Sequence, residues 1–392
     1  MTDAQTILVL NSGSSSIKFT LFAGQDPIVD GQISGLGAAP RISLKSSQDK
    51  DRFDRDLGSE DGQSHTTALA ALLPMLTSRT HGRAVDAVGH RVVHGGVDHA
   101  APIPIDQAAI ARLEKLVPLA PLHQPHNLAG IESARALFPD AVQVACFDTA
   151  FHRHHPWVND TFALPRALYE EGVRRYGFHG LSYEYILSHL EAADPRAHDG
   201  RLVVAHLGNG ASMCAIKNGQ SIGSTMGFTA LDGLPMGTRC GQLDPGVVLY
   251  LMTAKGMTAD DVTALLYTQS GLKGMSGISQ DMRTLQSSGD PDAKRAIDYF
   301  VFRIRRELGA MAAVLGGIDT LVFTGGIGEN SAMVREKVCA DQNWLGLAID
   351  PEKNMAAEQD ISSGPSTVKV MVIPTNEEEM IRRHTARILR AL

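Results

Sequence analysis

Short apolar runs recur along the chain, and several of them end at a polar or glycine-rich motif rather than at a simple turn. In the first half these runs are TILVL before NSGSSS, AVGHRVV before HGG and VQVACF before DTAFH. In the second half they are LVVAHL before GNGAS, TLVF before TGGIGEN and VKVMVI before PTNEEEM. Runs of this length, rich in Val, Ile and Leu, predict buried β-strands.

Helical patterns lie between the strand-like runs, and the clearest one extends over residues 294–315. Its apolar residues recur at intervals of three and four, which predicts an amphipathic helix. Strands that alternate with helices indicate an α/β architecture, in which ligands bind beyond the carboxyl ends of the strands. The apolar positions that carry the pattern are Ile297, Phe300, Val301, Ile304, Leu308 and Met311.

Two of the polar motifs share a further property. NSGSSS is followed by IKFTLF and GNGAS is followed by MCAI, so each motif is expected to join two strands of a hairpin. A Walker loop would instead lead from a strand into a helix. This weak internal repeat predicts two related halves, each of which offers one phosphate-facing hairpin.

The length of 392 residues is typical of two domains. We expect a first domain at 1–150, completed by a C-terminal helix at about 376–392, and a second domain at 151–375. The polar stretch from Ser46 to Ser64 is interpreted as a surface excursion of the first domain, and FHRHHPWVND as the crossing between domains.

Composition narrows the class of partner. The net charge is -7 and the basic residues are scattered, which argues against nucleic acid or an anionic membrane and favours small molecules. The four cysteines are far apart, which fits a reducing cytoplasm. The start MTDAQ is unlike a secretory signal, and no apolar stretch is as long as the ~18 residues of a membrane span. We therefore expect a soluble, cytoplasmic protein.

The glycine- and serine-rich motifs are candidates for phosphate binding. In the first hairpin, backbone N–H groups and hydroxyls could approach phosphate oxygens, with Lys18 as a mobile positive charge and Asn11 near a ligand or a metal-bound water. In HLGNGAS, two glycines around Asn209 would allow a close approach to a polyphosphate. Each motif alone is equally compatible with an ordinary turn, and His206 with a buried structural histidine.

Two further motifs are candidates for the nucleoside. TGGIGEN follows a strand but lacks the third glycine of a dinucleotide fingerprint, so we interpret it as a surface for a flat adenosine. A glycine-rich connection to a helix is the alternative. Asp281 and Arg283 of SGISQDMR could complete that pocket, although such a pair is usually a solvated face.

Arg91 and Arg239 each lie among glycines, where a guanidinium fork could meet a carboxylate or a phosphate. His179, between glycines, could donate to a transferring phosphoryl group, and Asp148 ends a strand, where functional carboxylates are common. Structural roles remain open for all four. Glu377 fits either a helix start or, if it faces the same site as Asn11, a Mg²⁺ site.

These residue types match phosphoryl transfer, which needs positive charge and aligned donors more than covalent chemistry. A sugar hydroxyl as acceptor would require a general base, whereas a carboxylate is already a nucleophile and requires a cationic clamp. The pair of arginines therefore favours a carboxylate acceptor and an acyl-phosphate product.

The sequence resembles the acetokinase family of the actin/Hsp70/hexokinase-like phosphotransferase superfamily. Ten motifs occur in the family's order over nearly the whole chain: LVLNSGSSSIK, GHRVVHGG, APLHQPHN, FDTAFH, YGFHG, HLGNGAS, MGTR with DP, GISQDMR, FTGGIGEN and IPTNEEE. The resemblance implies two actin-like (ribonuclease H-like) domains, each with a mixed five-stranded sheet flanked by helices and with the active site in the cleft between them. It also implies a homodimer.

The resemblance further implies the activity and the roles of individual residues. The reaction would be the reversible, Mg²⁺-dependent transfer of the γ-phosphoryl group of ATP to acetate by direct in-line transfer, with Mn²⁺ as a substitute metal. Asn11 and Glu377 would form the metal site, and Arg91 would bind the carboxylate or acyl phosphate. His179 and Arg239 would stabilise the transition state beside the essential carboxylate Asp148. The acyl pocket would consist of Val93, Leu122 and Phe178. The serines of the first hairpin and Gly13 would face the transferring phosphate. The ATP site would consist of Lys18, His206, Leu207, Gly208, Asn209, Gly210, Asp281, Met282, Arg283, Gly326, Ile327, Gly328, Glu329 and Asn330.

Three departures from the family pattern concern the substrate side. Ala230 stands in GFTAL where the family commonly has Pro, which could enlarge the acyl pocket and admit propionate. Gln242 of TRCGQLDP stands where an acidic or small residue is more usual, and His126 of HQPHN stands where Pro is common; we expect modest effects from both. Propionate kinase is the nearest alternative function. An actin-like nucleotide switch that hydrolyses ATP slowly is the alternative from another class, but it leaves the pair of arginines unexplained.

Overall fold

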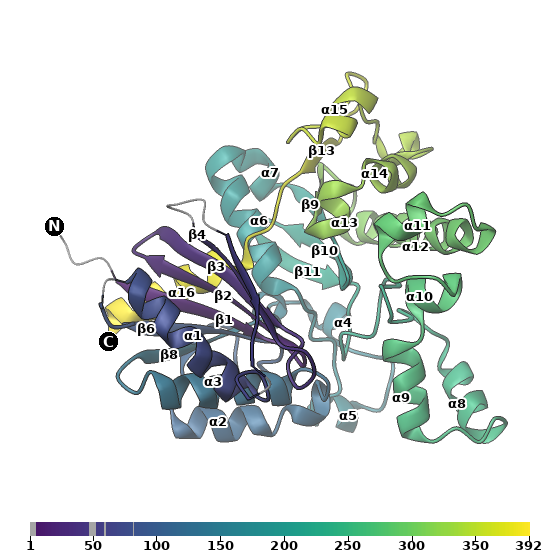
Figure 1. Cartoon of the computed structure of the whole chain (residues 1–392). Coiled ribbons are helices and arrows are strands. Elements are labelled where there is room, and N and C mark those ends of the chain that lie inside the picture. The colour runs from purple at the N-terminus through teal and green to yellow at the C-terminus, as the bar shows by residue number, and fades with distance from the viewer. Residues whose placement is uncertain (1–4, 47–51, 59, 81) are drawn as a thin grey trace. The chain divides into compact units, whose positions relative to one another are not determined.

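The computed structural model describes residues 5–46, 52–58, 60–80 and 82–392 (Figure 1). Its contacts divide the chain into two compact units. Unit 1 comprises Met1–Arg153 and Asn376–Leu392, and unit 2 comprises His154–Thr375. The first crossing of the chain thus lies within FHRHHPWVND. Residues 1–4 of the amino-terminal segment and positions 47–51 and 59 of the polar stretch lie outside the described residues.

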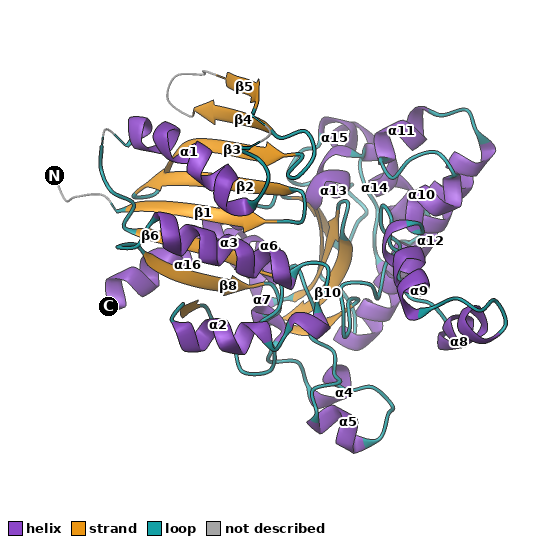
Figure 2. Cartoon of the chain, turned by 60° about the horizontal axis from the view of Figure 1, so that its bottom comes forward, coloured by secondary structure: helices purple, strands orange, loops and turns teal. Residues whose placement is uncertain are grey.

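Unit 1 is built on an eight-stranded mixed sheet, so the expectation of five strands in this unit is wrong (Figure 2). The β1–β2 pair is antiparallel, whereas β1, β6 and β8 run parallel. In order across the sheet the strands are β5 (Arg52–Asp56), β4 (Arg41–Ser46), β3 (Asp26–Ser34), β2 (Ser16–Ala23), β1 (Thr6–Ser12), β6 (Ala87–Val92), β8 (Val142–Phe147) and β7 (Ile103–Pro104).

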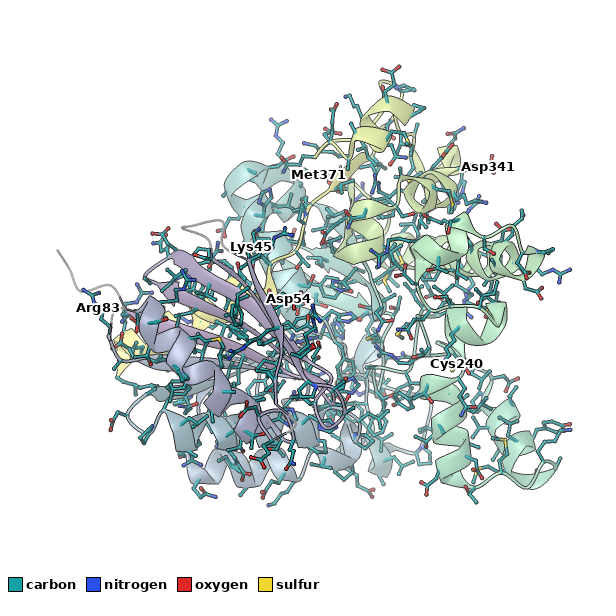
Figure 3. All side chains as sticks on the ribbon, viewed as in Figure 1. Lys45, Asp54, Arg83, Cys240, Asp341 and Met371 are labelled. Carbon is teal, nitrogen blue, oxygen red and sulfur yellow. The ribbon has the colours of Figure 1, made fainter. Side chains whose placement is uncertain are left out.

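The strand at the β5 edge explains part of this error. All five residues of β5 are exposed, so no alternation of apolar and polar residues marks it in the sequence. Arg41 of β4 pairs with Asp54 at 2.7 Å and with Asp56 at 3.2 Å. Figure 3 labels Lys45 of β4 and Asp54 of β5. Part of the polar stretch that we interpreted as a surface excursion is therefore an edge strand carrying charged side chains, a common device against edge-to-edge pairing.

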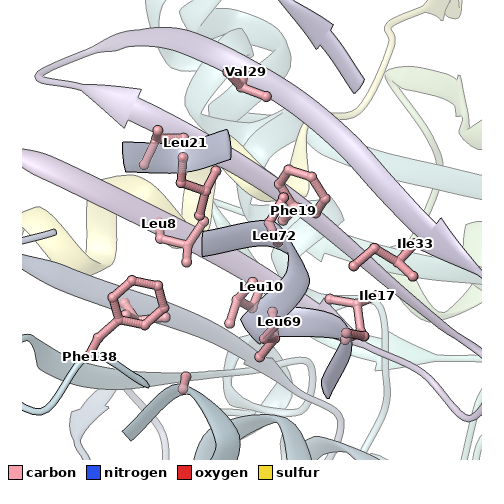
Figure 4. Packing of buried hydrophobic residues seen from close by; sticks show 14 of the residues in the cluster. Leu8, Leu10, Ile17, Phe19, Leu21, Val29, Ile33, Leu69, Leu72 and Phe138 are labelled. Carbon is pink, nitrogen blue, oxygen red and sulfur yellow. The ribbon is translucent and has the colours of Figure 1, made fainter. Parts of the chain in front are cut away.

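Helices cover both faces of the unit 1 sheet. Leu8 and Leu10 of β1 pack with Leu69 and Leu72 of α1 in one apolar cluster (Figure 4). The C-terminal helix α16 packs on β6 and β1. A Cβ added at Gly89 of β6 would lie 2.3 Å from Oγ1 of Thr385, so glycine permits this close approach. The helices of unit 1 are α1 (His65–Arg79), α2 (Gln107–Glu114), α3 (Gln124–Leu137) and α16 (Glu377–Ala391), with short 3-10 turns η1 (Val117–Leu119) and η2 (Ala150–His152).

Unit 2 contains the expected five-stranded mixed sheet. The order is β11 (Gln220–Ser224), β10 (Ala211–Lys217), β9 (Arg201–Leu207), β12 (Thr320–Thr324) and β13 (Lys369–Val372). β9 and β10 are antiparallel, and β9, β12 and β13 are parallel. The helix expected at 294–315 is observed as α12 (Pro291–Leu315), which begins at the Asp290 cap, packs on β10 and β9, and ends at Gly316 in a left-handed conformation.

The remaining helices of unit 2 are mostly short. They are α4 (Trp157–Asp160), α5 (Arg166–Glu170), α6 (Gly180–Ala193), α7 (Pro195–Asp199), α8 (Pro245–Thr253), α9 (Ala259–Thr268), α10 (Gly271–Ser276), α11 (Met282–Ser287), α13 (Gly325–Asn330), α14 (Ala332–Cys339) and α15 (Pro351–Ala356), with the 3-10 turn η3 (Asn343–Leu345). Within the described part of the chain, no helix is both long enough and apolar enough to cross a membrane.

Both predicted hairpins are confirmed. Asn11 and Lys18 lie opposite each other where β1 turns into β2, and Leu207 lies opposite Ala211 where β9 turns into β10. TGGIGEN leads from β12 directly into α13, as a strand-to-helix connection. The candidate residues therefore cluster at strand ends within each unit.

Candidate active site

Arg91 and Asp148 form a two-pronged ion pair in unit 1. Arg91 lies near the end of β6, and Asp148 directly follows the parallel neighbour β8. Nε of Arg91 donates to Oδ1 of Asp148 at 3.0 Å, and Nη2 donates to Oδ2 at 2.7 Å. The Asp148 side chain is 2% exposed and that of Arg91 is 20% exposed. The buried carboxylate thus orients a guanidinium that still reaches solvent.

Glu377, the first residue of α16, adds a second carboxylate at this position. Its Oε2 lies 3.6 Å from Nε of Arg91. Burial alone would lower the pKa of Arg91, but the negative charges of Asp148 and Glu377 outweigh it and the pKa is raised. The pKa of the neighbouring Glu378 is raised by burial and by the charge of Glu377. The Arg91 guanidinium therefore lies next to several carboxylates at these strand ends.

Asn11 lies at the same end of the central strands of the sheet. β1 and β6 pair in parallel up to Leu10 and His90, so Asn11 and Arg91 are the next residues of neighbouring strands. Lys18 is exposed on β2 opposite Asn11. The unit 1 candidates for the metal, the carboxylate and ATP thus come from β1, β2, β6 and α16 at one end of the sheet.

The structure corrects the role expected for two residues of the NSGSSS turn. Ser12 is buried, and a Cβ added at Gly130 of α3 would lie 2.2 Å from its Oγ. The Ser12 side chain therefore packs against the helix. The N–H of Gly13 donates to the carbonyl oxygen of Ser16 at 2.8 Å and is used within the hairpin. Ser14 and Ser15 are the exposed residues of the turn and remain candidates for the phosphate.

The three residues expected to form the acyl pocket are distributed over both units. Val93 follows β6 and is buried, and its N–H donates to Oδ1 of Asn127 at 2.9 Å. Leu122 is 40% exposed in the turn before α3. Phe178 belongs to unit 2, where it is buried directly before His179. Their assembly into a pocket remains a prediction.

In unit 2, His179 and Arg239 converge on Gly210. A Cβ added at Gly210 would lie 3.1 Å from both Nε2 of His179 and Nη2 of Arg239. His179 has a left-handed backbone with φ 58° at the start of α6, and its Nδ1 lies 2.8 Å from Oγ of Ser212 on β10. Glycine at position 210 therefore leaves room for the two candidate transition-state residues to lie side by side.

Further contacts hold these two side chains in place. Nη1 of Arg239 donates to the carbonyl oxygen of Ala230 at 2.6 Å. The ring of His179 stacks on that of His206 with centroids 4.3 Å apart. Nδ1 of His206 in turn lies 2.8 Å from Oγ of Ser182. The packing supports a positioning role for His206 behind His179.

A cavity of about 640 Å³ in unit 2 collects most of the predicted nucleotide residues. It lies between the β9–β10 turn, the start of α11 and the β12–α13 connection. Sequence reasoning missed Gln280, Gln286 and Ser331, although Gln280 lies inside the GISQDMR motif. The lining residues are Gly208, Asn209, Gln280, Asp281, Met282, Arg283, Gln286, Gly326, Ile327, Asn330 and Ser331.

Asp281 and Arg283 pair with each other at this cavity. Nη2 of Arg283 lies 2.6 Å from Oδ2 of Asp281, and the Arg283 side chain is 88% exposed. The hydrogen bonds from Arg283 lower the pKa of Asp281 to about 2. A Cβ added at Gly326 would meet no atom within 4 Å, so this part of the glycine-rich surface is open. A cavity with an open glycine-rich wall beside a polar pair suits a nucleoside.

Several predicted nucleotide residues in unit 2 do not line this cavity: His206, Leu207, Gly210, Gly328 and Glu329. Leu207 is fully buried. Oε1 of Glu329 accepts hydrogen bonds from the N–H groups of Gly325 at 2.9 Å and Thr375 at 3.1 Å. The Glu329 carboxylate therefore fixes the glycine-rich turn, and a direct ATP contact of this side chain is not supported by its orientation.

Comparison with known families gives a match over nearly the whole chain. A model described as the Acetokinase family matches residues 6–383. The chain is 53% identical over 397 residues to an acetate kinase of Methylocella silvestris, with 98% of each chain covered. It is 52% identical over 394 residues to an acetate kinase of Rhodopseudomonas palustris strain TIE-1, again with 98% of each chain covered.

Solved structures agree with this match. An acetate kinase from Porphyromonas gingivalis superposes with a TM-score of 0.88 at 39% identity, covering 98% of this chain and 100% of that one. A propionate kinase from Francisella tularensis superposes with a TM-score of 0.92 at 36% identity, covering 98% and 99%. The fold is therefore shared with kinases named for two different short-chain acids.

Proposed function

Because this chain belongs to the acetokinase family, we propose that it transfers the γ-phosphoryl group of ATP to acetate, reversibly, giving acetyl phosphate and ADP. The chain is a phosphotransferase by its family, and the sites at the strand ends suggest how it works. The proposal assigns the acceptor acid to residues of unit 1 and the nucleotide to the cavity of unit 2.

The observation that carries the proposal is the oriented guanidinium of Arg91. A carboxylate acceptor needs no general base, but it needs a fixed cation to hold it in line. Both carboxylate oxygens of Asp148 accept hydrogen bonds from Arg91. We therefore assign Asp148 the task of orienting Arg91 rather than removing a proton, and buried Val93 a place beside the methyl group of acetate.

The transfer needs charge stabilisation at the moving phosphoryl group. One carboxylate oxygen of acetate forms a bond to the γ-phosphorus while the bond from that phosphorus to the β–γ bridging oxygen breaks, and ADP leaves with the electron pair. His179 and Arg239 would donate to the equatorial oxygens, because both converge on Gly210. Direct in-line transfer follows as the proposed route.

Mg²⁺, with Mn²⁺ as a substitute, is part of this proposal. The donor set fits, since an amide oxygen of Asn11 and the carboxylate of Glu377 are oxygen ligands of the kind magnesium takes beside phosphate oxygens and water. The pKa of Glu378 is raised first by burial and then by the charge of Glu377, and a divalent cation would relieve the repulsion between these two carboxylates. When bound, the metal would neutralise charge on the polyphosphate.

Propionate is a second candidate substrate. Two observations favour it: Ala230 stands where the family commonly has proline, and one similar solved structure is a propionate kinase. The carbonyl oxygen of Ala230 accepts a hydrogen bond from Arg239, so this segment is adjacent to a proposed transition-state residue. We propose that acetate is preferred and that propionate is also used.

We also propose a cytoplasmic location and a homodimeric assembly. The four cysteines of the chain are all free, as in proteins of a reducing cytoplasm. A homodimer is proposed by family membership alone.

Trapping the product with hydroxylamine tests the function. ATP and Mg²⁺ with acetate should give acetyl hydroxamate, and kcat/KM measured for acetate and propionate should rank the two acids. ATP hydrolysis without any acyl hydroxamate from either acid would reject the kinase assignment and would support the nucleotide-switch alternative.

A further inference from the structure

The APLHQPHN motif has no part in the proposed reaction apart from Leu122, yet it supplies the buried residue Asn127 to the middle of the unit 1 sheet. Asn127 lies in the first turn of α3 and is 4% exposed. Its Oδ1 accepts from the N–H of Val93 at 2.9 Å, and its Nδ2 donates to the carbonyl oxygen of Ser12 at 2.8 Å. One side chain thus bridges the end of β1 and the end of β6.

The bridge lies where the backbone pairing between these strands stops. β1 and β6 pair only up to Leu10 and His90, although β1 continues to Ser12 and β6 to Val92. Each of the two strands stays paired with its other neighbour up to its end: β1 pairs with β2 through Ser12, and β6 pairs with β8 through Val92. The two central strands therefore separate from each other only at their last residues.

A carboxamide has the donor and the acceptor of a peptide group, so Asn127 takes the place of the missing backbone hydrogen bonds. It separates the strand ends by the width of one side chain while satisfying buried backbone groups that would otherwise lack partners. The proposed ligands lie at these strand ends, with Asn11 on β1, Arg91 on β6 and Val93 directly after β6.

Neighbouring residues of the motif reinforce the bridge. Nε2 of Gln124 donates to the carbonyl oxygen of His94 at 3.2 Å. His126 stacks on His65 with ring centroids 5.9 Å apart, and Nε2 of His65 lies 2.8 Å from the carbonyl oxygen of Gly13. Contacts from α3 and α1 thus hold the residues on either side of the strand ends.

We propose that Asn127 is a positioning residue that sets the separation between the metal-binding strand end at Asn11 and the acceptor-binding strand end at Arg91 and Val93. This inference rests on the proposed function for its kinetic consequences. The bridge itself is independent of that function.

Asn127→Leu removes both hydrogen bonds with a side chain of the same branched shape, and Asn127→Asp keeps an acceptor for Val93 but loses the donor to Ser12. In both variants kcat/KM for acetate should fall on the order of tenfold to a hundredfold, because small displacements of reacting groups have effects of that size. The Mg²⁺ concentration for half-maximal rate should rise, while KM for ATP should change by less than about twofold, since the nucleotide cavity belongs to unit 2.

Gln143→Met is the matched control. Gln143 is a buried amide of the same sheet that donates to the carbonyl oxygens of Phe138 and Ala141 and accepts from Nε2 of His90 at 2.8 Å, without contacting Asn11, Arg91 or Val93. It should lower the thermal midpoint about as much as Asn127→Leu does, with kcat/KM for acetate within about twofold of wild type. An equal kinetic loss in this control would overturn the positioning role.

Amide hydrogen exchange at Val93 provides a readout that does not depend on activity. Exchange should accelerate in Asn127→Leu and stay slow in Asn127→Asp, which keeps the acceptor. Slow exchange in Asn127→Leu would overturn the bridge even if the enzyme is not an acetate kinase. Wild-type kcat/KM in both folded Asn127 variants would overturn the positioning role. If Asn127→Leu does not fold, the Asp variant decides the outcome by its kinetics.

Discussion

Arg91 and Asp148 face each other across the ends of two parallel strands, with two hydrogen bonds of 3.0 and 2.7 Å between the guanidinium and the carboxylate. The pair places a fixed positive charge where the proposed acceptor acid binds. Asp148 is buried and Arg91 is partly exposed, which fits the proposal that the carboxylate acts on the substrate through the arginine.

Arg91→Ala, Arg91→Lys and Asp148→Asn should each reduce kcat/KM for acetate by about 10- to 100-fold or more, since each removes charge-assisted hydrogen bonds. Lysine keeps the charge but lacks the fork that pairs with Asp148. Steady-state kinetics with circular dichroism as a folding control measures this. Near-normal turnover in Arg91→Ala would refute the clamp.

Gly210→Ala should lower kcat by about tenfold or more, because small displacements of catalytic groups are costly. The new methyl carbon would lie 3.1 Å from Nε2 of His179 and from Nη2 of Arg239, so both side chains must shift slightly. Arg239→Ala should reduce turnover still more. Gly289→Ala is the control, since a Cβ there meets no atom within 4 Å. Equal activities of the two alanine variants would argue against convergence at Gly210.

Gly326→Ala and Glu329→Gln should separate nucleotide binding from structure. The Gly326 methyl group would enter open space beside the cavity, so KM for ATP should rise with little change in the thermal midpoint. Glu329→Gln weakens two hydrogen bonds from backbone N–H groups, so the midpoint should fall by a few degrees with KM for ATP nearly unchanged. A raised KM for ATP with an unchanged thermal midpoint in Glu329→Gln would instead indicate that Glu329 contacts ATP directly.

Glu377→Gln should raise the Mg²⁺ concentration needed for half-maximal rate, because it removes a carboxylate ligand proposed for the metal. EDTA should abolish product formation in the wild type, and added Mg²⁺ or Mn²⁺ should restore it. Glu378→Gln serves as the comparison at the next residue of α16. An unchanged Mg²⁺ dependence in Glu377→Gln would remove Glu377 from the metal site.

His90 should make unit 1 sensitive to acid. Burial lowers its pKa to about 4, although Nε2 donates to Oε1 of Gln143 at 2.8 Å. The unfolded chain, with a pKa near 6.5, binds a proton that the folded chain does not, so stability falls as pH drops from about 6.5 to about 4. The loss from His90 is about 2 kcal/mol between pH about 7 and about 5.

Urea unfolding of the wild type and of His90→Gln at these pH values measures that contribution. The variant is expected to be less stable at neutral pH, since it alters a buried site, but to lose about 2 kcal/mol less on acidification. Parallel pH profiles for the two proteins would contradict a neutral, buried His90.

Much of the architecture could be predicted from local sequence patterns. The hairpins at Asn11 and at Asn209, the helix ending at Leu315 and the connection at Gly325 each depend on short-range periodicity and turn residues, and each is observed. β5 was missed because an exposed edge strand has no apolar face to produce a pattern. The motifs also located most residues that line the unit 2 cavity proposed for the nucleotide, because their glycines and polar side chains occur at the ends of strands and the starts of helices.

The sequence by itself determined the family, the chemistry and the candidate residues, since ten motifs in order identify them without coordinates. The tertiary structure alone decided the direction of each side chain. It turned Ser12 toward Gly130 and Glu329 toward two backbone N–H groups, and it placed Asn127 between Ser12 and Val93. These outcomes depend on partners that are remote in sequence, and a hydrogen bond across 115 positions leaves no local periodicity to detect.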